Sequence, residues 1–380
     1  MQTLIPNAAD LFRSKQPYAY WLGNIPSIGN KTIHYLLDVF EYPEVIYQTS
    51  EQELSAHLTK KQLANLLASR ETWDIQKNYQ LLCQKRISFL PCYHPAFPTK
   101  LKNIPDPPYC IYFVGKLPSI NEPLIAIIGA RSCSEYGRKT AEYFSKAFAE
   151  ANIGIVSGLA RGIDGYSQTV ALSNGGRTYA ILGCGVDICY PAENFPIYQK
   201  IPASGALISE YPPGTQPRSN LFPQRNRIIS GLCDALLVIE AKEKSGTLIT
   251  VDMALEQGRE VYAVPGRICD ALSFGCNRLI KQGASIATSP QDIVSDLYVE
   301  AMHCEESSLL QKTGYVLSEK EQTLLHLLDY QPVSLDHIYQ QITKNPTCGN
   351  ITIPNLMHML TQLTLKGLIR QQAGSYYLAL

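Results

Sequence analysis

Four short segments of this chain combine glycine with small polar or basic residues. Three of them directly follow a run of apolar residues, and the fourth begins five residues after one. They are Gly129-Ala-Arg131-Ser132, Ser157-Gly158-Leu-Ala-Arg161-Gly162, Gly183-Cys-Gly185 and Lys244-Ser245-Gly246-Thr247. Glycine lets a backbone approach an anion closely, and free N–H groups at the start of a helix point toward it. Tight turns also require glycine, but four such segments at neighbouring strand ends favour a site that holds phosphates.

A fifth segment, residues 218–227, is typical of a surface that binds nucleic acid. It holds three arginines, one phenylalanine, several amide side chains and no acid. Guanidinium groups match phosphate oxygens, and a phenylalanine ring can stack on an unpaired base. We therefore expect this segment, with Arg131 and Arg161, to hold single-stranded DNA. The candidate residues within it are Phe222, Arg225, Asn226 and Arg227.

A structural interpretation of the same segment stays open. Phe222 could belong to the core, and the arginines could pair with Glu210 or Glu240, two acids that lie near strand ends. No dedicated helix for reading a DNA groove accompanies the segment, which disfavours recognition of duplex sequence.

Several enzyme classes are disfavoured by motifs that the chain lacks. The run Gly129-Ala-Arg-Ser-Cys-Ser is not G-x-G-x-x-G, and no carboxylate ends the next strand to hold a ribose. Lys244-Ser-Gly-Thr does not complete a P-loop, and Gly154-Ile-Val-Ser-Gly is not a nucleophile elbow. We therefore predict no dinucleotide, no ATP hydrolysis and no other cofactor.

Proton transfer by histidine is disfavoured as well, because all seven histidines lie outside residues 95–302. The acids Asp164, Asp187, Glu210 and Glu240 could act alone, but such residues more often cap helices or orient arginines. We accordingly predict no catalytic residue and no metal ligand.

The composition indicates a folded protein whose basic surface is local. Hydrophobic residues make up 45% of the 380 residues, charged residues 17%, and the formal net charge is zero. The 11 cysteines form no C-x-x-C pair, which favours reduced thiols over disulfides or a zinc site. Residues 1–6 lack a secretory pattern and no run of 18 apolar residues occurs, so we expect a cytoplasmic protein without a membrane span.

A sheet must position the glycine-rich segments, because short apolar runs alternate with amphipathic stretches between residues 83 and 300. The predicted strands are Leu124–Ile128, Ile153–Val156, Thr178–Leu182, Ala206–Ser209, Ala235–Ile239 and Glu260–Val264. A helix is predicted over Tyr136–Ala151. Ligands bind at the carboxyl ends of strands in an open parallel sheet, which is where these segments fall. We predict an α/β fold with an extended Rossmann-like parallel or mixed sheet.

The predicted domains are an N-terminal helical region over residues 1–82, the Rossmann-like domain over 83–300, a linker over 301–316 and a small unit over 317–380. In the last, Ser318-Glu-Lys-Glu321 forms a capping-box pattern. Further helices are predicted to start at Ser334 and near Pro354. With a terminal β-hairpin, this pattern predicts a winged helix.

Motifs along most of the chain recur together in one known family. They are Tyr93-His-Pro, Ile104-Pro-Asp-Pro-Pro108, Ile128-Gly-Ala-Arg131, Val156-Ser-Gly-Leu-Ala-Arg-Gly-Ile-Asp164, Leu182-Gly-Cys-Gly-Val-Asp187, Tyr190-Pro191, Arg225-Asn-Arg-Ile-Ile229 and Lys244-Ser-Gly-Thr-Leu-Ile-Thr250. On these residues the chain resembles the DNA-processing protein A (DprA/Smf) family. The resemblance implies a homodimer without enzymatic activity that binds single-stranded DNA, protects incoming strands in natural transformation and loads the recombinase RecA. It also implies that Gly129 and Arg131 help to form the DNA pocket.

The flanks of the chain are consistent with the resemblance. Residues 25–32 look like the turn of a helix–hairpin–helix motif in a SAM-like domain, with Ser27 where glycine is common. The third helix of the small C-terminal unit carries one lysine and no arginine, so we expect weak DNA binding and a protein-contact or regulatory role there.

One enzymatic alternative stays open. A related Rossmann-type enzyme cleaves nucleoside monophosphates, and there Lys244-Ser-Gly-Thr would be a phosphate loop served by a catalytic Glu240 or Glu256.

Overall fold

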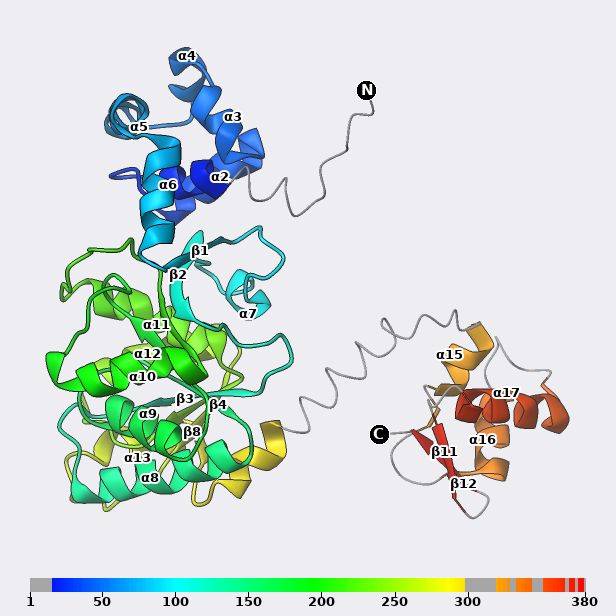
Figure 1. Ribbon diagram of the computed structural model, residues 1–380. Helices are drawn as coiled ribbons and strands as arrows, with labels where there is room; N and C mark the ends of the chain where they lie inside the picture. Colours follow the sequence, from blue (N-terminus) through cyan, green and yellow to red (C-terminus); the bar gives the residue numbers. More distant parts are fainter. Residues whose placement is uncertain are drawn as a thin grey trace, which may run out of the picture. The chain divides into compact units, whose positions relative to one another are not determined.

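The computed structural model describes residues 16–297, 319–325, 327–328, 333–343, 351–365, 369–372 and 375–378. The chain divides into two compact units, Met1–Glu305 and Glu306–Leu380, and each is described by itself (Figure 1). The predicted linker over residues 301–316 and the predicted capping residue Ser318 lie outside the described residues.

A nine-stranded sheet forms the centre of the first unit, with the order β1-β2-β6-β5-β4-β3-β7-β8-β9. The strands are β1 (Ser88–Pro91), β2 (Cys110–Gly115), β3 (Leu124–Ile128), β4 (Gly154–Ser157), β5 (Thr178–Leu182), β6 (Ala206–Ser209), β7 (Ala235–Val238), β8 (Glu260–Ala263) and β9 (Ser285–Ile286). Strands β3 to β9 pair in parallel, whereas β2 joins β6, and β1 joins β2, antiparallel. The mixed, mainly parallel sheet confirms the predicted fold class.

The structure confirms the predicted strands, which were recognisable in the sequence because helices cover both faces of the sheet. β3, β5 and β6 have the predicted bounds, β7 and β8 each end one residue earlier than predicted, and β4 is shifted by one residue at both ends. Every residue of β3, β4, β5, β6 and β7 is buried. A strand buried on both faces reads as a continuous apolar run, which is the pattern that the sequence shows.

Two layers of helices cover the sheet. The helices after β2 are α8 (Glu135–Glu150), α9 (Ile163–Ser173), η1 (Ala192–Asn194), α10 (Phe195–Ser204), α11 (Leu221–Leu232), α12 (Gly246–Glu256) and α13 (Phe274–Lys281). Ile125 and Ile127 of β3 pack with α8 and α9, whereas Ala126 and Ile128 pack with α11 and α12. The chain thus changes from one face of the sheet to the other between the neighbouring strands β3 and β7. Such a switch point is where open α/β sheets bind ligands.

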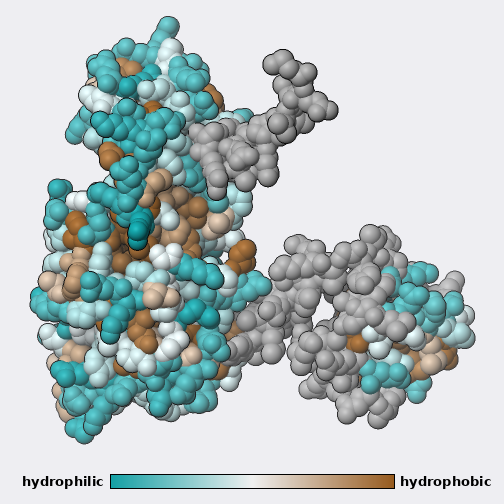
Figure 2. Space-filling model, viewed as in Figure 1, coloured by the Kyte–Doolittle hydropathy of each residue, from teal (hydrophilic) through white to brown (hydrophobic). Residues whose placement is uncertain are grey.

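The N-terminal region consists of short helices that pack against the antiparallel edge of the sheet (Figure 1). They are α2 (Asn30–Phe40), α3 (Pro43–Gln48), α4 (Glu51–Leu54), α5 (Lys60–Thr72) and α6 (Ile75–Gln84), and α7 (Thr99–Lys102) follows β1. Trp21 and Leu22 are fully buried in one cluster with Phe89 of β1 and Tyr112 of β2. Figure 2 shows a mostly hydrophilic face in this view, with apolar surface gathered below these helices.

The turn before α2 has the geometry that makes glycine common at its centre. Ser27 adopts φ 68°, a left-handed conformation that few side chains favour. The carbonyl of the preceding Pro26 accepts a hydrogen bond from the Asn65 side chain of α5 at 3.0 Å. The turn is therefore tied to a neighbouring helix, and a contact between it and phosphate stays a prediction.

The described residues of the second unit form three helices and a three-stranded sheet. Its elements are α15 (Glu319–Leu325), β10 (Val333–Ser334), α16 (Leu335–Ile342), α17 (Ile353–Leu365), β11 (Ile369–Gln372) and β12 (Ser375–Leu378), with the sheet order β10-β12-β11. Ser334 caps α16 by accepting a hydrogen bond from the backbone N–H of His337, which confirms the predicted helix start. The winged-helix assignment and the predicted domain boundaries stay predictions.

Candidate nucleic-acid interface

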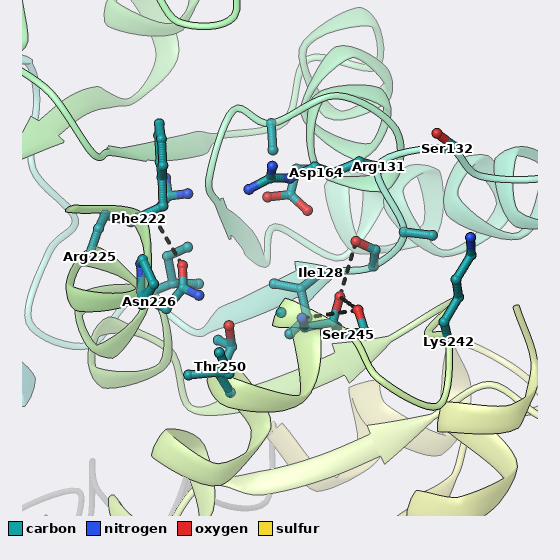
Figure 3. Close-up of a pocket in the computed structure, with 18 of the residues that line it drawn as sticks. Ile128, Arg131, Ser132, Asp164, Phe222, Arg225, Asn226, Lys242, Ser245 and Thr250 are labelled. Carbon is teal, nitrogen blue, oxygen red and sulfur yellow. Dashed lines mark hydrogen bonds between the residues drawn. The ribbon is translucent and has the colours of Figure 1, made fainter. Parts of the chain in front are cut away.

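A cavity of about 640 Å³ opens at the carboxyl ends of β3 and β7, where the helices change face (Figure 3). The loop after β3, the first turns of α11 and the loop between β7 and α12 form its walls. The predicted site residues that line it are Gly129, Arg131, Ser132, Phe222, Arg225, Asn226, Lys244, Ser245, Gly246 and Thr247. Those that do not line it are Ser157, Gly158, Arg161, Gly162, Gly183, Gly185 and Arg227. The structure therefore brings four of the five predicted segments to one cavity, although the segment after β4 lines it only through Ala160.

Two aromatic rings and one guanidinium form a stacked group at this cavity. The rings of Tyr190 and Phe222 lie 5.4 Å apart between centroids, at an interplanar angle of 29°. The Cζ atom of Arg131 lies 5.9 Å from the centroid of the same Phe222 ring. Phe222 is only partly buried, so it is not the core residue of the structural interpretation. Flat π-surfaces beside a cation can accept a base and its phosphate.

Gly183 leaves the space that the Phe222 ring occupies. A Cβ atom at position 183 would lie 2.7 Å from Cδ1 of that ring, closer than real Cβ contacts. The glycine after β5 thus positions an aromatic side chain of the cavity. No contact between the Gly183 backbone and an anion is needed to account for the glycine.

Arg225 is buried, contrary to the prediction that its guanidinium reaches outward to phosphates. It is 5% exposed, and its Nη1 donates to the carbonyl of Gly158 at 2.8 Å and to the carbonyl of Ile181. Burial lowers the pKa of Arg225 to about 10, so the side chain stays charged at neutral pH. Arg225 therefore supplies positive charge from the floor of the cavity while it fastens α11 to β4 and β5.

Asp164 is the carboxylate beside Arg225 at this floor (Figure 3). Burial raises the pKa of Asp164, whereas the charge of Arg225 and the N–H of Gly158 act in the opposite direction. The Gly158 N–H donates to Asp164 Oδ2 at 3.2 Å. The carboxylate thus orients the loop after β4, and it partly balances the charge of Arg225.

Arg227 lies away from the cavity, and the structural interpretation is confirmed for it. Its Nη2 donates to Glu210 Oε1 at 2.5 Å, and its Nε donates to Asp106 Oδ2 at 3.0 Å. Its side chain is 9% exposed. Glu210 also accepts from Asn30 at the start of α2, at 2.6 Å. Arg227 therefore links α11 to the N-terminal region instead of facing a ligand, because two carboxylates surround it.

Helical periodicity explains why neighbouring arginines differ. α11 begins at Leu221, so Phe222, Arg225 and Asn226 fall three or four residues apart and share one face. Arg227 projects from a different face, toward Glu210. Residues 221–227 of the predicted segment thus form the first half of a helix, and two of its three arginines, Arg225 and Arg227, make hydrogen bonds that hold the fold.

The remaining glycines and Ser157 serve the backbone. Ser157 is fully buried, and its hydroxyl donates to the carbonyl of Ile127 at 2.6 Å. Gly162 has φ 74°, and a Cβ atom there would lie 2.1 Å from the carbonyl oxygen of Ala130. The N–H of Gly185 donates to the carbonyl of Thr215 at 2.9 Å. These contacts hold the loops together, and the predicted phosphate contacts of the three residues stay untested.

Arg161 is exposed but paired. Its Nη2 lies 2.6 Å from Oε1 of Glu193, and both side chains are about 60% exposed. The hydrogen bond with Arg161 contributes to lowering the pKa of Glu193, after the backbone hydrogen bond of Glu193 itself. The pair is therefore ionised at neutral pH, and a phosphate that contacts Arg161 has to compete with this carboxylate.

The loop after β7 supplies two exposed lysines. Lys242 and Lys244 both line the cavity. Ser245 caps α12 by accepting a hydrogen bond from the Thr247 N–H at 3.2 Å. The Thr247 hydroxyl donates to the carbonyl of Gly129 at 3.3 Å, which joins this loop to the loop after β3.

Several residues that line this cavity are not among the predicted site residues. Lys242, Tyr190, Asp164 and Thr250 also line it. Lys242 lies two residues before the glycine-rich Lys244 motif, and its positive charge so close to that motif could have marked it as a site residue. Tyr190 belongs to the Tyr190-Pro191 pair that the family resemblance includes, but its position beside Phe222 depends on the fold.

The two glutamates of the enzymatic alternative do not line this cavity. Glu240 is 3% exposed and accepts hydrogen bonds from the Ser134 hydroxyl and, at 2.9 Å, from the Ser134 N–H. Glu256 is exposed at the last residue of α12, the opposite end of the helix from Gly246. Glu240 thus holds the start of α8, and Glu256 lies at the end of α12 that is farther from the cavity.

The described ranges of the chain contain neither a cluster of metal-ligand side chains nor a membrane-spanning helix. Within those ranges, no cluster of three or more His, Cys, Asp or Glu side chains is arranged to hold a metal ion. The nine cysteines that the structure describes are free thiols. None of the described helices has the length and apolar character needed to cross a bilayer.

Comparison with known proteins places this chain in one family. The family model described as "DNA recombination-mediator protein A" matches residues 88–298, more than half of the chain. DNA processing protein DprA of Streptococcus pneumoniae is 44% identical over 201 residues, which cover 53% of this chain and 71% of that protein. Protein Smf of a Synechocystis species is 30% identical over 94% of this chain and 98% of its own length.

Solved structures agree with these matches. The X-ray structure of DprA from Streptococcus pneumoniae aligns with a TM-score of 0.66 at 35% identity, over 73% of this chain and 97% of that one. The structure of DNA processing protein A from Helicobacter pylori, described for its single-stranded DNA binding mode, aligns with a TM-score of 0.51 at 27% identity. That alignment covers 57% of this chain and 97% of the other. Sequence and structure together show that this chain belongs to the DNA recombination-mediator protein A (DprA/Smf) family.

Proposed function

We propose that the cavity at the β3–β7 switch point binds single-stranded DNA and leaves it chemically unchanged. The observation that carries the proposal is one cavity lined by the cations Arg131, Lys242 and Lys244 together with the stacked rings of Tyr190 and Phe222. Cations neutralise phosphates, and exposed ring faces stack on unpaired bases of any sequence. A duplex keeps its bases stacked inside, so it cannot use the rings.

The relatives support this choice of ligand. The Helicobacter pylori protein is described as binding single-stranded DNA, and it shares the fold of this chain. The proposed role follows the family resemblance: a homodimer protects incoming strands during natural transformation and loads RecA onto them. The absence of covalent chemistry is part of the proposal, because Glu240 and Asp164 are both engaged in holding loops.

The test compares single-stranded with duplex DNA on the full chain. Fluorescence anisotropy with labelled oligo-dT should give binding that weakens steeply with salt, since phosphate neutralisation releases counterions. A duplex of equal length should bind more weakly under the same salt. Equal affinity for both forms, or no binding of oligo-dT, would overturn the proposal.

A second assay addresses the enzymatic alternative. The full chain is incubated with nucleoside monophosphates, and release of free base is followed by chromatography. We expect no release above that of the buffer. Release that is lost in an Asp164→Asn variant would show that the cavity is a catalytic site.

A further inference from the structure

A second cavity lies directly beside the first and shares two residues with it. It has a volume of about 290 Å³, and Arg131 and Ser132 line both cavities. It is also lined by Arg138 of α8, Tyr166 and Thr169 of α9, and Asn194 of η1. Arg131 thus stands between two adjoining hollows, with the stacked rings on one side and α8 and α9 on the other.

The second cavity has a positive lining. Arg131 and Arg138 both line it, and the described residues around it include no carboxylate. Arg138 has one acidic neighbour, Glu135, at 3.9 Å, and the two side chains are 55% and 69% exposed. Water and salt screen an exposed pair of this kind, so it holds Arg138 only weakly. Arg138 is therefore available to an anion.

The remaining walls are fixed and carry one aromatic ring. The Asn194 amide donates to the carbonyls of Leu159 and Ala160 at 2.8 and 3.0 Å, which secures the loop before α9. Tyr166 is partly buried against the core of the α8–α9 layer and exposes the rest of its ring. A preformed hollow with a cation and a ring suits a phosphate and its attached sugar or base.

Resting on the proposed function, we infer that a bound strand continues from the first cavity, across Arg131, into the second, where Arg138 holds a further phosphate. Small-ligand pockets span roughly 300–1,000 Å³. The first cavity lies well within this range, and the second, at 290 Å³, lies at its lower limit. The second cavity therefore accommodates one nucleotide of a strand that is already bound in the first cavity.

A strand that enters both cavities makes the contribution of Arg138 depend on the length of the oligonucleotide. An oligonucleotide short enough to fill only the first cavity does not reach Arg138. A longer one does, and it gains one neutralised phosphate. Arg138 should thus matter only above a threshold length, whereas Arg131, which lines both cavities, should matter at every length.

The experiment measures affinity against oligo-dT length for the full chain and two variants, Arg138→Ala and Lys139→Ala. Lengths run from about three to about twelve nucleotides, within the usual range of single-strand sites. Lys139 is the matched control, because it is the next exposed cation of α8 and lines neither cavity. Titration with dTMP alone tests whether a free nucleotide is the ligand instead.

Arg138→Ala should match the wild type on the shortest bound oligomer and lose roughly tenfold in affinity on the longest, the lower range for a hydrogen bond to a charged group. The slope of log K against log salt should fall by about 0.7 on the longest oligomer only. Lys139→Ala should follow the wild type throughout.

Three results would overturn the inference. Arg138→Ala and Lys139→Ala could weaken binding alike, which would indicate a general charge effect. Arg138→Ala could act equally at all lengths, or it could weaken dTMP binding without changing the length dependence. If the wild type binds no oligo-dT, the proposed function fails first, and this inference falls with it.

Discussion

The Arg131 guanidinium carbon lies 5.9 Å from the centroid of the Phe222 ring, although the two residues are far apart in the sequence. Arg131 follows β3, and Phe222 is in the first turn of α11. The relationship depends on Gly183, whose missing side chain leaves room for the ring. Three separate segments thus create one surface with a cation beside a stacking platform.

Removing the ring should weaken DNA binding without unfolding the protein. We expect Phe222→Leu to lower oligo-dT affinity by about 1–3 kcal/mol, the usual contribution of a base stacked on an aromatic side chain. Phe195→Leu is the matched control, because Phe195 is exposed and stacks on Tyr198 outside the cavity. Anisotropy titrations check both variants. Equal affinities for the two would show that Phe222 is not a stacking platform.

Arg227 should matter for stability and not for DNA contact. Arg227→Met leaves the Glu210 carboxylate, whose side chain is 10% exposed, without its cationic partner, and breaking a buried ion pair costs about 3–5 kcal/mol. We expect a clearly lower free energy of unfolding in urea, with DNA affinity retained below the transition. A variant as stable as the wild type that binds DNA poorly would restore the original prediction that Arg227 contacts phosphates.

Much of the fold could be predicted because buried parallel strands leave a plain record in the sequence. Leu124–Ile128 and Thr178–Leu182 are mostly apolar runs, and a glycine-rich segment directly follows each of them. Position along α11 was harder to predict. Whether an arginine faces the cavity or the core depends on the helical phase and on partners more than 100 residues away, such as Asp106 for Arg227.

The sequence predicts which segments line the candidate site better than it predicts the contacts that their residues make. Gly129, Arg131 and Lys244 line the cavity as the motifs predict. Gly183 was predicted to meet phosphate, yet it makes room for a ring. Glycine serves close backbone approach in either case, so its presence in a sequence does not distinguish the two uses. Tyr190 reaches its position beside Phe222 through tertiary packing.

Glu193 should limit the affinity for DNA. If Arg161 contacts a phosphate, as the sequence predicts, its pairing with Glu193 at 2.6 Å competes with that contact. Glu193→Gln removes the competitor, and we expect oligo-dT affinity to rise a few-fold, as for an exposed pair. In an Arg161→Ala background the same substitution should have little effect. A gain of equal size in both backgrounds would mean that Arg161 is not involved.

Asp292 should make the first unit sensitive to acid. Backbone N–H groups of Ser289 and Thr288 lower the pKa of Asp292 from 3.8 to about 2. A depressed pKa stabilises the fold above the unfolded value, and this stabilisation is lost as pH falls from 3.8 toward 2. Denaturation at several pH values should show that Asp292→Asn is destabilised most above pH 3.8. A difference from wild type that does not change with pH would contradict this account.

The central claim is that Arg131 meets a phosphate of single-stranded DNA in the cavity between β3 and β7. The most direct measurement is the salt dependence of oligo-dT binding by the full chain and its Arg131→Ala variant. We predict that the variant binds roughly tenfold more weakly, equally for oligo-dT and oligo-dA, with the slope of log K against log salt reduced by about 0.7. Unchanged affinity and an unchanged slope in the variant would contradict the account.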